Sequence, residues 1–377
     1  MVSTVGKVRE VLEAAYPPEL AESWDAVGLI CGDPAAEVTK VAFALDCTQE
    51  VALRAVAMGA QLLVVHHPLL LRGVTSVAAD TPKGQVIHTL LRGGVALFAA
   101  HTNADSARPG VNDKLAELLG VTPGRPILPK PQGLDKWGVM VPAEPAEVAE
   151  RVKRAVFAAG AGALGDYQEC AFQFEGTGQF CPGEQAQPAI GASGELAHVR
   201  EVRVEFVAPR PARRAVERAL LEAHPYEEPA FDIVELANTV DIEHAYGLGR
   251  VGELDQPMPL KEFVARVAER LPSTEWGVRA AGDPELMVRR VAVSSGSGDG
   301  FLDAVRSLKV DVYVTSDLRH HPADEHLRAG GPAIVDTAHW ASEFPWCSQA
   351  AEVVERELGL RTEVIDVRTD PWTISAK

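Results

Sequence analysis

Short hydrophobic runs alternate with segments of helical spacing along the first third of the chain. The runs are continuous and rich in β-branched and aliphatic residues, which is typical of strands buried on both faces. They lie at residues 41–45, 61–65 and 95–100. Helical patterns lie at residues 49–58, 84–91 and 111–119, after a first one that begins at Ser3 and stops before Pro17. This alternation predicts an α/β fold, with a parallel or mostly parallel sheet covered by helices.

The pattern changes after Thr122, where closely spaced prolines form a connection that is incompatible with a helix. The segment that follows predicts the order strand, helix, strand, strand, helix, strand. Its strands lie at residues 137–141, 168–174, 199–207 and 230–236, and its helices at residues 145–158 and 211–222. This is the split order of a ferredoxin-like α+β module.

The α/β pattern resumes in the last third of the chain. The predicted strands there are residues 291–294, 310–315, 333–336 and 362–367, and the predicted helices are residues 260–270, 300–308, 322–329 and 342–358. Because the two outer segments are alike, we predict one discontinuous α/β domain of residues 1–125 plus 244–377, with two similar halves. Residues 132–240 would be inserted into it, and three separate domains in series are the alternative.

Composition and charge narrow the function classes. With 46% hydrophobic and 24% charged residues, the chain matches a globular protein. A net charge of -17 opposes non-specific binding to nucleic acid or to anionic membranes. No segment approaches the roughly 18 uninterrupted apolar residues of a membrane span, and the five scattered cysteines form no C-x-x-C pair. We therefore expect a cytoplasmic protein with free thiols.

Metal-binding residue types follow three of the predicted strands, at the points where open α/β sheets place their sites. They are His66, His67, His101, Asp105, His339 and Glu343. Adjacent imidazoles at a strand end normally point to opposite sides, so His66 and His67 serve one site only if the chain turns, as Pro68 favours. If a helix starts in the last motif, His339 and Glu343 lie about one turn apart and can converge on one ion.

Each motif alone has an ordinary explanation, such as a loop, a capping His101 or a surface helix pair. Together at strand ends they favour a metal site, because buried imidazoles and carboxylates are costly without partners. Nitrogen and oxygen ligands without sulfur suit zinc, manganese, iron or cobalt. The set exceeds the needs of one tetrahedral zinc, so we predict two divalent ions about 3.5–4 Å apart, with Glu343 as the candidate bridge. Such a pair lowers the pKa of a shared water, which predicts hydrolytic chemistry.

Two further polar stretches are candidates for substrate binding. Asp317, His320 and His321 follow the predicted strand 310–315, where a role beside the metal site and no role at all are equally open. The other stretch contains Gly296, Ser297 and Gly298, whose backbone N–H groups could face a phosphate, although an ordinary tight turn explains it equally well.

The motifs taken together resemble a known family. The His-His-Pro motif at His66, His-Thr-Asn-Ala-Asp at His101, Ser-Ser-Gly-Ser-Gly, Thr-Ser-Asp-Leu-Arg-His-His and His-Trp-Ala-Ser-Glu at His339 match the NIF-three-like dinuclear-metal hexameric family. Its members are often named GTP cyclohydrolase 1 type 2 homologues. The resemblance covers about residues 5–120 and 247–373. It departs at Ala26, where the family usually has asparagine, a position outside the ligand set.

The resemblance implies a ligand set, an assembly and a reaction. The implied metal ligands are His66, His67, Asp105, His339 and Glu343, with possible assistance from His101 and His321. The middle segment resembles the PII- or CutA-like module of longer members, with its best match at residues 224–229, and a homohexamer is implied. The implied reaction converts GTP and water to 7,8-dihydroneopterin triphosphate and formate. The alternatives are a metal-dependent phosphoesterase or nuclease, and a non-catalytic hexameric metal-binding or sensing protein.

Overall fold

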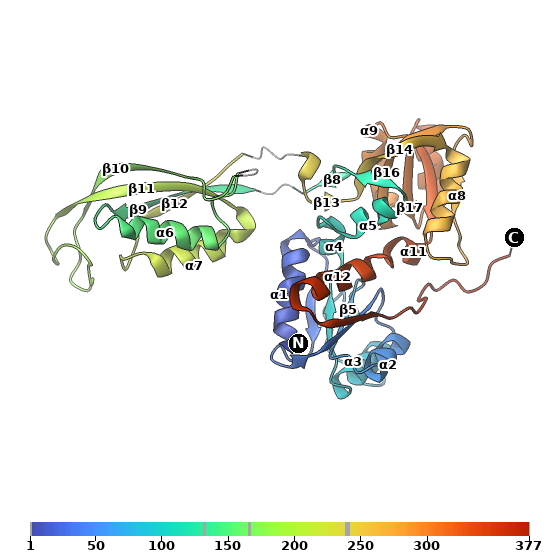
Figure 1. Ribbon diagram of the computed structural model, residues 1–377, viewed down its shortest axis with the longest axis horizontal. Helices are drawn as coiled ribbons and strands as arrows, with labels where there is room; N and C mark the ends of the chain where they lie inside the picture. Colours follow the sequence, from blue (N-terminus) through green and yellow to red (C-terminus); the bar gives the residue numbers. More distant parts are fainter. Residues whose placement is uncertain (1, 131–132, 165–166, 238–241, 377) are drawn as a thin grey trace. The chain divides into compact units, whose positions relative to one another are not determined.

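The structure is a computed structural model that describes residues 2–130, 133–164, 167–237 and 242–376 (Figure 1). It divides into two compact units, one of residues 1–130 with 241–377 and one of residues 131–240. The positions 132 and 240 that we predicted as the limits of the insert lie outside the described residues. No helix in the described part is long and apolar enough to cross a membrane.

The first sheet of the larger unit contains the three hydrophobic runs of the first segment. Its strands, in spatial order, are β19 (Arg361–Val364), β4 (Lys40–Ala44), β5 (Leu62–Val65), β6 (Ala96–Ala99) and β2 (Gly28–Cys31). Neighbouring strands are parallel except for β2, which is antiparallel to β6. The sheet is thus mostly parallel, as predicted.

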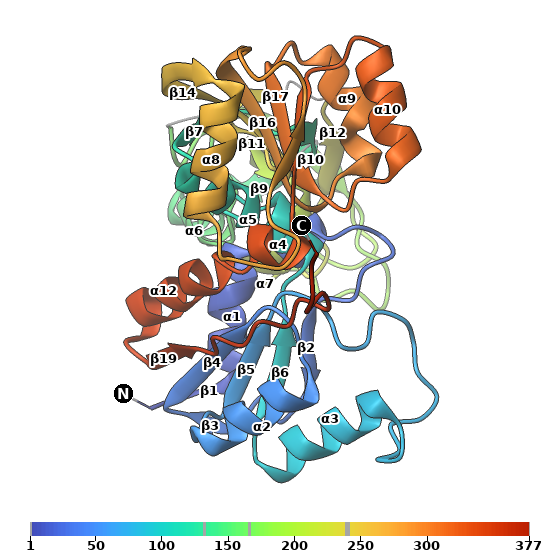
Figure 2. The same ribbon diagram turned by 90° about the vertical axis from the view of Figure 1, so that its right-hand side faces the viewer.

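Helices cover both faces of this sheet, which explains why its strands are apolar throughout (Figure 2). On one face α2 (Gln49–Ala57) and α3 (Pro82–Arg92) share a core with Ala42, Leu63 and other alternate strand residues. On the other face α1 (Val5–Ala15) and α12 (Trp346–Leu358) pack with the remaining residues of the same strands.

The second sheet has a parallel centre and antiparallel edges. Its strands, in spatial order, are β15 (Arg279–Ala281), β18 (Ala333–Thr337), β17 (Val312–Ser316), β16 (Met287–Ser297), β14 (Arg250–Pro259) and β7 (Val121–Pro123). The parallel strands β16, β17 and β18 were predicted, whereas β14, β15, β7 and the edge strand β2 were not. β14 contains glycine, two prolines and a register shift between Glu253 and Met258, so it has no continuous apolar run.

The helices of this half are α8 (Leu260–Arg270), α9 (Leu302–Ser307) and α10 (His320–Arg328). Four short strands pair outside the main sheets: β1 (Ser3–Thr4), β3 (Glu37–Val38), β8 (Leu128–Pro129) and β13 (Gly247–Leu248). The predicted helix 342–358 is wrong in one respect, because the chain forms two helices, α11 (His339–Glu343) and α12. Pro345 separates them, since proline supplies no N–H for the hydrogen bond that would continue α11 into α12.

The two segments of the larger unit exchange elements. β7 belongs to the first segment but pairs with β14 of the last, whereas β19 and α12 belong to the last segment but pack on the first sheet. A fully buried ion pair adds to this, because Arg250 donates from Nε and Nη2 to both carboxylate oxygens of Asp113 at 2.8 Å. Asp113 lies on α5 (Val111–Leu118). The segments therefore fold as one body.

The smaller unit is a four-stranded antiparallel sheet with two helices. Its elements are β9 (Leu134–Pro142), α6 (Glu147–Ala158), β10 (Ala171–Phe180), β11 (Ala197–Pro209), α7 (Arg213–Ala223) and β12 (Phe231–Glu235). The strand order is β10-β11-β9-β12, and α6 and α7 cover one face (Figure 1). Trp137, Val152 and Val204 lie in the core between the helices and the sheet.

Candidate metal centre

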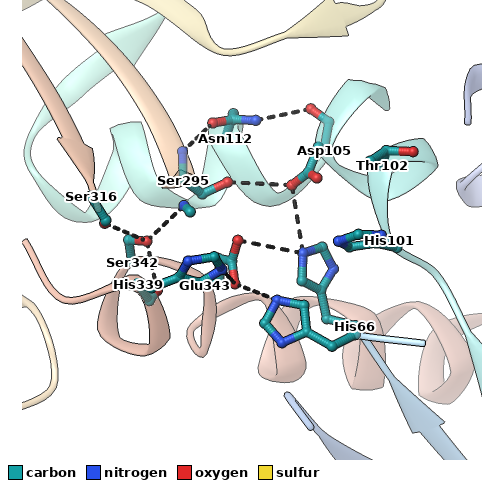
Figure 3. A network of polar contacts seen from close by, with 12 residues as sticks. His66, His101, Thr102, Asp105, Asn112, Ser295, Ser316, His339, Ser342 and Glu343 are labelled. Atoms are coloured by element: carbon teal, nitrogen blue, oxygen red, sulfur yellow. Dashed lines mark hydrogen bonds and ion pairs between the residues drawn. The ribbon is translucent and has the colours of Figure 1, made fainter. Parts of the chain in front are cut away.

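Six polar side chains from distant parts of the sequence meet at the carboxyl ends of the parallel strands. His66 and His67 follow β5, and β6 leads through His101 into the short helix α4 (Thr102–Ser106), which carries Asp105. His339 and Glu343 lie one turn apart on α11, directly after β18. Figure 3 shows Glu343, His66 and Asp105 pointing toward one another.

The ligand atoms form three overlapping groups in the described part of the chain, each with its atoms within 4.8 Å of one another. The groups are His67, His339 and Glu343; His66, Asp105 and Glu343; and His66, His67 and His101. Glu343 belongs to two of them. The structure thus brings together all the residues that we predicted as metal ligands, with His101 beside them.

The carboxylate of Glu343 faces two ligand sets at once. Its Oε2 lies 2.9 Å from Nε2 of His67 and 3.1 Å from Nε2 of His339. Its Oε1 lies 3.7 Å from Nε2 of His66, which is also 3.7 Å from Oδ1 of Asp105. Each of the two oxygens is thus directed at a separate set of ligands. A carboxylate that bridges two metal ions requires this arrangement.

One buried atom at the centre of the cluster, Nε2 of His66, has no hydrogen-bond partner among the described residues. The Nδ1–H of His66 donates to the carbonyl of Ala100 at 2.8 Å, which leaves a lone pair on Nε2 directed at Asp105 and Glu343. An unsatisfied buried acceptor costs about 1–3 kcal/mol. A divalent cation would satisfy all of these atoms, so the residues present fit a metal.

The other three histidines each contact a carboxylate through Nδ1. These contacts are His67 to Asp46 at 2.7 Å, His101 to Asp25 at 2.9 Å and His339 to Asp317 at 2.7 Å. A carboxylate that accepts the Nδ1–H fixes the ring orientation and leaves Nε2 as the ligand atom. We predicted for Asp317 either a role at the site, in binding substrate or beside the metal ligands, or no role; its contact with His339 agrees with a place beside the ligands, and a substrate role stays a prediction.

Sequence reasoning missed the roles of Asp25 and Asp46. Asp46 follows the strand residues 41–45, so the rule that located the other candidates could have located it. It also accepts a hydrogen bond from the hydroxyl of Thr369. Asp25 precedes β2 in a loop and accepts hydrogen bonds from the backbone and hydroxyl of Thr102 as well as from His101. No strand-end signal marks it.

Gly296 lies directly against the cluster. Its φ is +61°, and a Cβ at this position would lie 2.3 Å from Oε1 of Glu343 and 3.2 Å from Nε2 of His339. The backbone N–H of Gly296 donates to Ser342 Oγ, and that of Gly298 donates to the Ser316 carbonyl at 3.2 Å. Both N–H groups therefore have protein partners, and the glycine at 296 serves close approach.

The remaining predicted substrate residues lie at the end of β16 and at the start of α10. Ser297 is exposed at the end of its strand. His320 and His321 are also exposed, with ring centroids 5.1 Å apart, and they belong to none of the ligand groups of the described residues. A substrate role for these three residues stays a prediction.

Opposite charges control protonation in the cluster. Burial opposes protonation of His67, but the charges of Glu343 and Asp46 outweigh it and raise the pKa of His67 to about 10. The charge of Glu343 likewise raises the pKa of His339 to about 11 against the effect of burial. Burial would raise the pKa of Glu343, yet the surrounding histidines hold it well below its usual range. The carboxylates thus stabilise positive charge at this site. Protons on the histidines supply that charge unless metal ions displace those protons.

The fold and the cluster define a class of protein, an α/β protein with a buried histidine and carboxylate centre suited to divalent metal ions. Residues 3–371 match the family model described as Duf34/NIF3 (NGG1p interacting factor 3). The chain belongs to this family, which confirms the resemblance stated above.

Relatives named GTP cyclohydrolase 1 type 2 homolog match nearly the whole chain. One from Mycobacterium tuberculosis is 54% identical over 371 residues, which cover 97% of this chain and 96% of the relative. One from Bacillus subtilis is 36% identical over 372 residues, with 97% of each chain covered. Among solved structures, a Bacillus cereus protein related to NIF3 has 34% identity and a TM-score of 0.84, and a Staphylococcus aureus protein has 29% identity and a TM-score of 0.75. Both comparisons cover 99% of each chain.

Proposed function

We propose that this chain is a metal-dependent hydrolase with two divalent ions per subunit. The observation that supports the proposal most is the Glu343 carboxylate, whose two oxygens face separate ligand sets. His67 and His339 would hold one ion with Glu343, and His66 and Asp105 would hold the other. When bound, a pair of zinc, manganese, iron or cobalt ions lowers the pKa of a water and polarises a substrate.

The residues of the chain would position these ions and move protons beside them. The Nδ1 atoms of His67 and His339 are held by carboxylates, so their Nε2 atoms face the centre. His101 is held in the same way by Asp25 and lies in one group with His66 and His67. It is therefore placed to accept or donate a proton at Nε2 beside a reacting substrate.

The substrate that we propose is GTP, because the relatives are named GTP cyclohydrolase 1 type 2 homolog. GTP and water would give 7,8-dihydroneopterin triphosphate and formate. Hydrolysis of phosphate esters is the second candidate, since two ions held on either side of Glu343 would also suit in-line displacement at phosphorus.

We further propose a cytoplasmic homohexamer whose insert is a ferredoxin-like module of the PII or CutA type. The element order and the strand order β10-β11-β9-β12 of the insert support the module. With a net charge of -17, we expect a small nucleotide rather than nucleic acid as the partner of the site. Light scattering of the full chain tests the assembly, and a monomer would contradict it.

The test of the activity uses the full chain loaded separately with Zn²⁺, Mn²⁺, Fe²⁺ and Co²⁺. Metal is counted by elemental analysis, and the products of GTP are followed as formate and as the fluorescent pterin formed on oxidation. The control is the double variant His67→Ala Glu343→Ala. Pterin no greater than in this control would contradict the GTP reaction, and a panel of phosphate esters would then test the second candidate. Turnover of neither would favour a metal-binding or sensing protein.

A further inference from the structure

A cavity of about 400 Å³ adjoins the candidate metal centre. His67 and His339 line it on the side of the cluster. Trp276 and residues of the irregular segment after β19 form other walls, among them Thr369, Asp370 and Trp372. Sequence reasoning found no role for this segment, which has neither periodicity nor a motif.

Side-chain contacts fasten this segment on both sides of Trp372. The hydroxyl of Thr369 donates to Oδ2 of Asp46, whose Oδ1 contacts the Nδ1 of His67. Farther along, the hydroxyl of Ser375 donates to Oε2 of Glu275 at 2.8 Å. The segment is therefore a built wall of the cavity that is connected to a candidate metal ligand through one carboxylate.

Asp370 contributes a carboxylate to this wall. Asp370 is only 7% exposed. Its Oδ1 accepts a hydrogen bond from the backbone N–H of Trp372 at 3.3 Å. Its Oδ2 is buried without a hydrogen-bond partner in the described part of the chain. A carboxylate oxygen that lacks a donor can be satisfied by a ligand that brings an N–H or O–H group, provided that a small side-chain movement exposes the oxygen to the cavity.

Two tryptophans form an aromatic surface in the same cavity. The rings of Trp276 and Trp372 have centroids 6.1 Å apart and an angle of 38° between their planes. Arg279 lies over the Trp276 ring at 4.5 Å and also pairs with Asp336, which fixes that ring in position. Trp372 is 59% exposed, so it presents a free face that a flat ring can cover.

We propose that this cavity binds the flat nitrogen heterocycle of the substrate, which stacks on Trp372 and Trp276 and donates N–H groups to Asp370. A guanine base fits this chemistry, because its ring N–H and neighbouring amino group offer two donors along one edge to a carboxylate. The inference rests on the proposed function for the identity of the reaction. It adds that Asp370 selects the base and that Trp372 binds it.

The test measures binding of nucleosides without phosphate, so that it does not depend on turnover. Guanosine, inosine and adenosine are titrated calorimetrically into the metal-loaded full chain, and the metal content of each variant is measured. Inosine lacks the amino donor and adenosine lacks the ring N–H, so we expect guanosine to bind most tightly. Asp370→Asn should weaken guanosine binding on the order of tenfold and remove most of this preference.

Variants at Trp372 separate stacking from hydrogen bonding. Trp372→Ala should weaken binding of all three nucleosides on the order of tenfold, and Trp372→Phe should restore most of the loss. The matched control is Ile374→Ala in the same segment, because Ile374 is 89% exposed and does not line the cavity. It should bind like the unmodified chain.

The outcomes distinguish this inference from the proposed reaction. If GTP is not converted but guanosine binding follows the expected pattern, the reaction is wrong and the base site stands. If GTP is converted while Asp370→Asn and Trp372→Ala bind guanosine as Ile374→Ala does, the base site is wrong and the reaction stands. Absence of nucleoside binding to the metal-loaded chain also overturns the base site.

Discussion

Replacing Gly296 by alanine should weaken metal binding through one steric contact. The new Cβ would lie 2.3 Å from Oε1 of Glu343, whereas an ordinary contact begins at 3.4 Å. The carboxylate would have to move by about 1 Å, the size of displacement that disturbs a preorganised site. Changes next to metal ligands typically lower affinity by about 10–100-fold, so we expect a loss of roughly 1.4–2.8 kcal/mol of metal-binding free energy.

Backbone strain in the alanine variant lowers folding stability separately from the steric contact, and Gly359 provides a control for this strain. Gly296 and Gly359 both have φ of +61°, but a Cβ at Gly359 has nothing within 4 Å. An alanine at either position meets about 1–2 kcal/mol of left-handed strain, partly offset by lower entropy of the unfolded chain. Gly359→Ala therefore reports strain alone, and the difference between the variants reports the contact with Glu343.

The assay is competition for zinc against a chromophoric chelator, together with metal counts by elemental analysis. Unfolding of the metal-free proteins is followed in parallel to measure strain. We expect a larger stability loss in Gly296→Ala than in Gly359→Ala, because only the first meets Glu343, and a lower zinc affinity only in Gly296→Ala. Equal zinc affinity in the two variants would refute the close packing of Gly296 against the bridging carboxylate.

Three further predictions concern charge in the larger unit. Glu343→Gln removes the charge shared by both ligand sets, so elemental analysis should find fewer ions per chain than in the unmodified protein. Arg250→Met leaves Asp113 buried without its partner, and urea unfolding should show a loss of about 3–5 kcal/mol. Metal binding must displace protons from His67 and His339, whose pKa values are raised to about 10 and 11. Calorimetry in buffers of different ionisation enthalpy should therefore show proton release near pH 7, and affinity that rises with pH.

Each of these predictions has a contradicting result. Full metal content in Glu343→Gln would exclude the bridge. For the buried ion pair, the control is Arg289→Met, because Arg289 pairs with Glu253 on the surface. This replacement should lower the free energy of unfolding by less than about 1 kcal/mol. Similar losses in Arg250→Met and Arg289→Met would show that the buried pair is unimportant. Proton uptake on metal binding would reverse the sign expected for the raised pKa values of His67 and His339.

The sequence predicted the parts of the fold whose signals are local. Buried parallel strands appear as continuous apolar runs, so β4, β5 and β6 were found at residues 41–45, 61–65 and 95–100 with small errors at their ends. The edge strand β15 was missed because one side of an edge strand is unpaired and its sequence can carry charges. β14 pairs with both β16 and β7, and it was missed because its glycine, prolines and register shift leave no continuous apolar run. The break at Pro345 could have been predicted from the proline itself, which lacks the N–H of a helix interior.

For the candidate site too, the sequence predicted what depends on local signals and not what depends on tertiary packing. His66, His67, Asp105, His339 and Glu343 directly follow strands or lie within a turn of them, so strand-end position and residue type were sufficient to propose them. Their relative geometry could not be predicted, since it depends on how two segments pack. Asp370 and Trp372 lie in an irregular segment, where only tertiary contacts bring side chains to the cavity.

The exchanged strands β7 and β19 also restrict how an ion could enter or leave. His66 and Glu343 come from different segments, and parting them would require rupture of pairings in both sheets. Such an opening would have a free energy near that of unfolding the whole unit. Ions should therefore exchange through the cavity beside His67 and His339, and a bound base should slow their release.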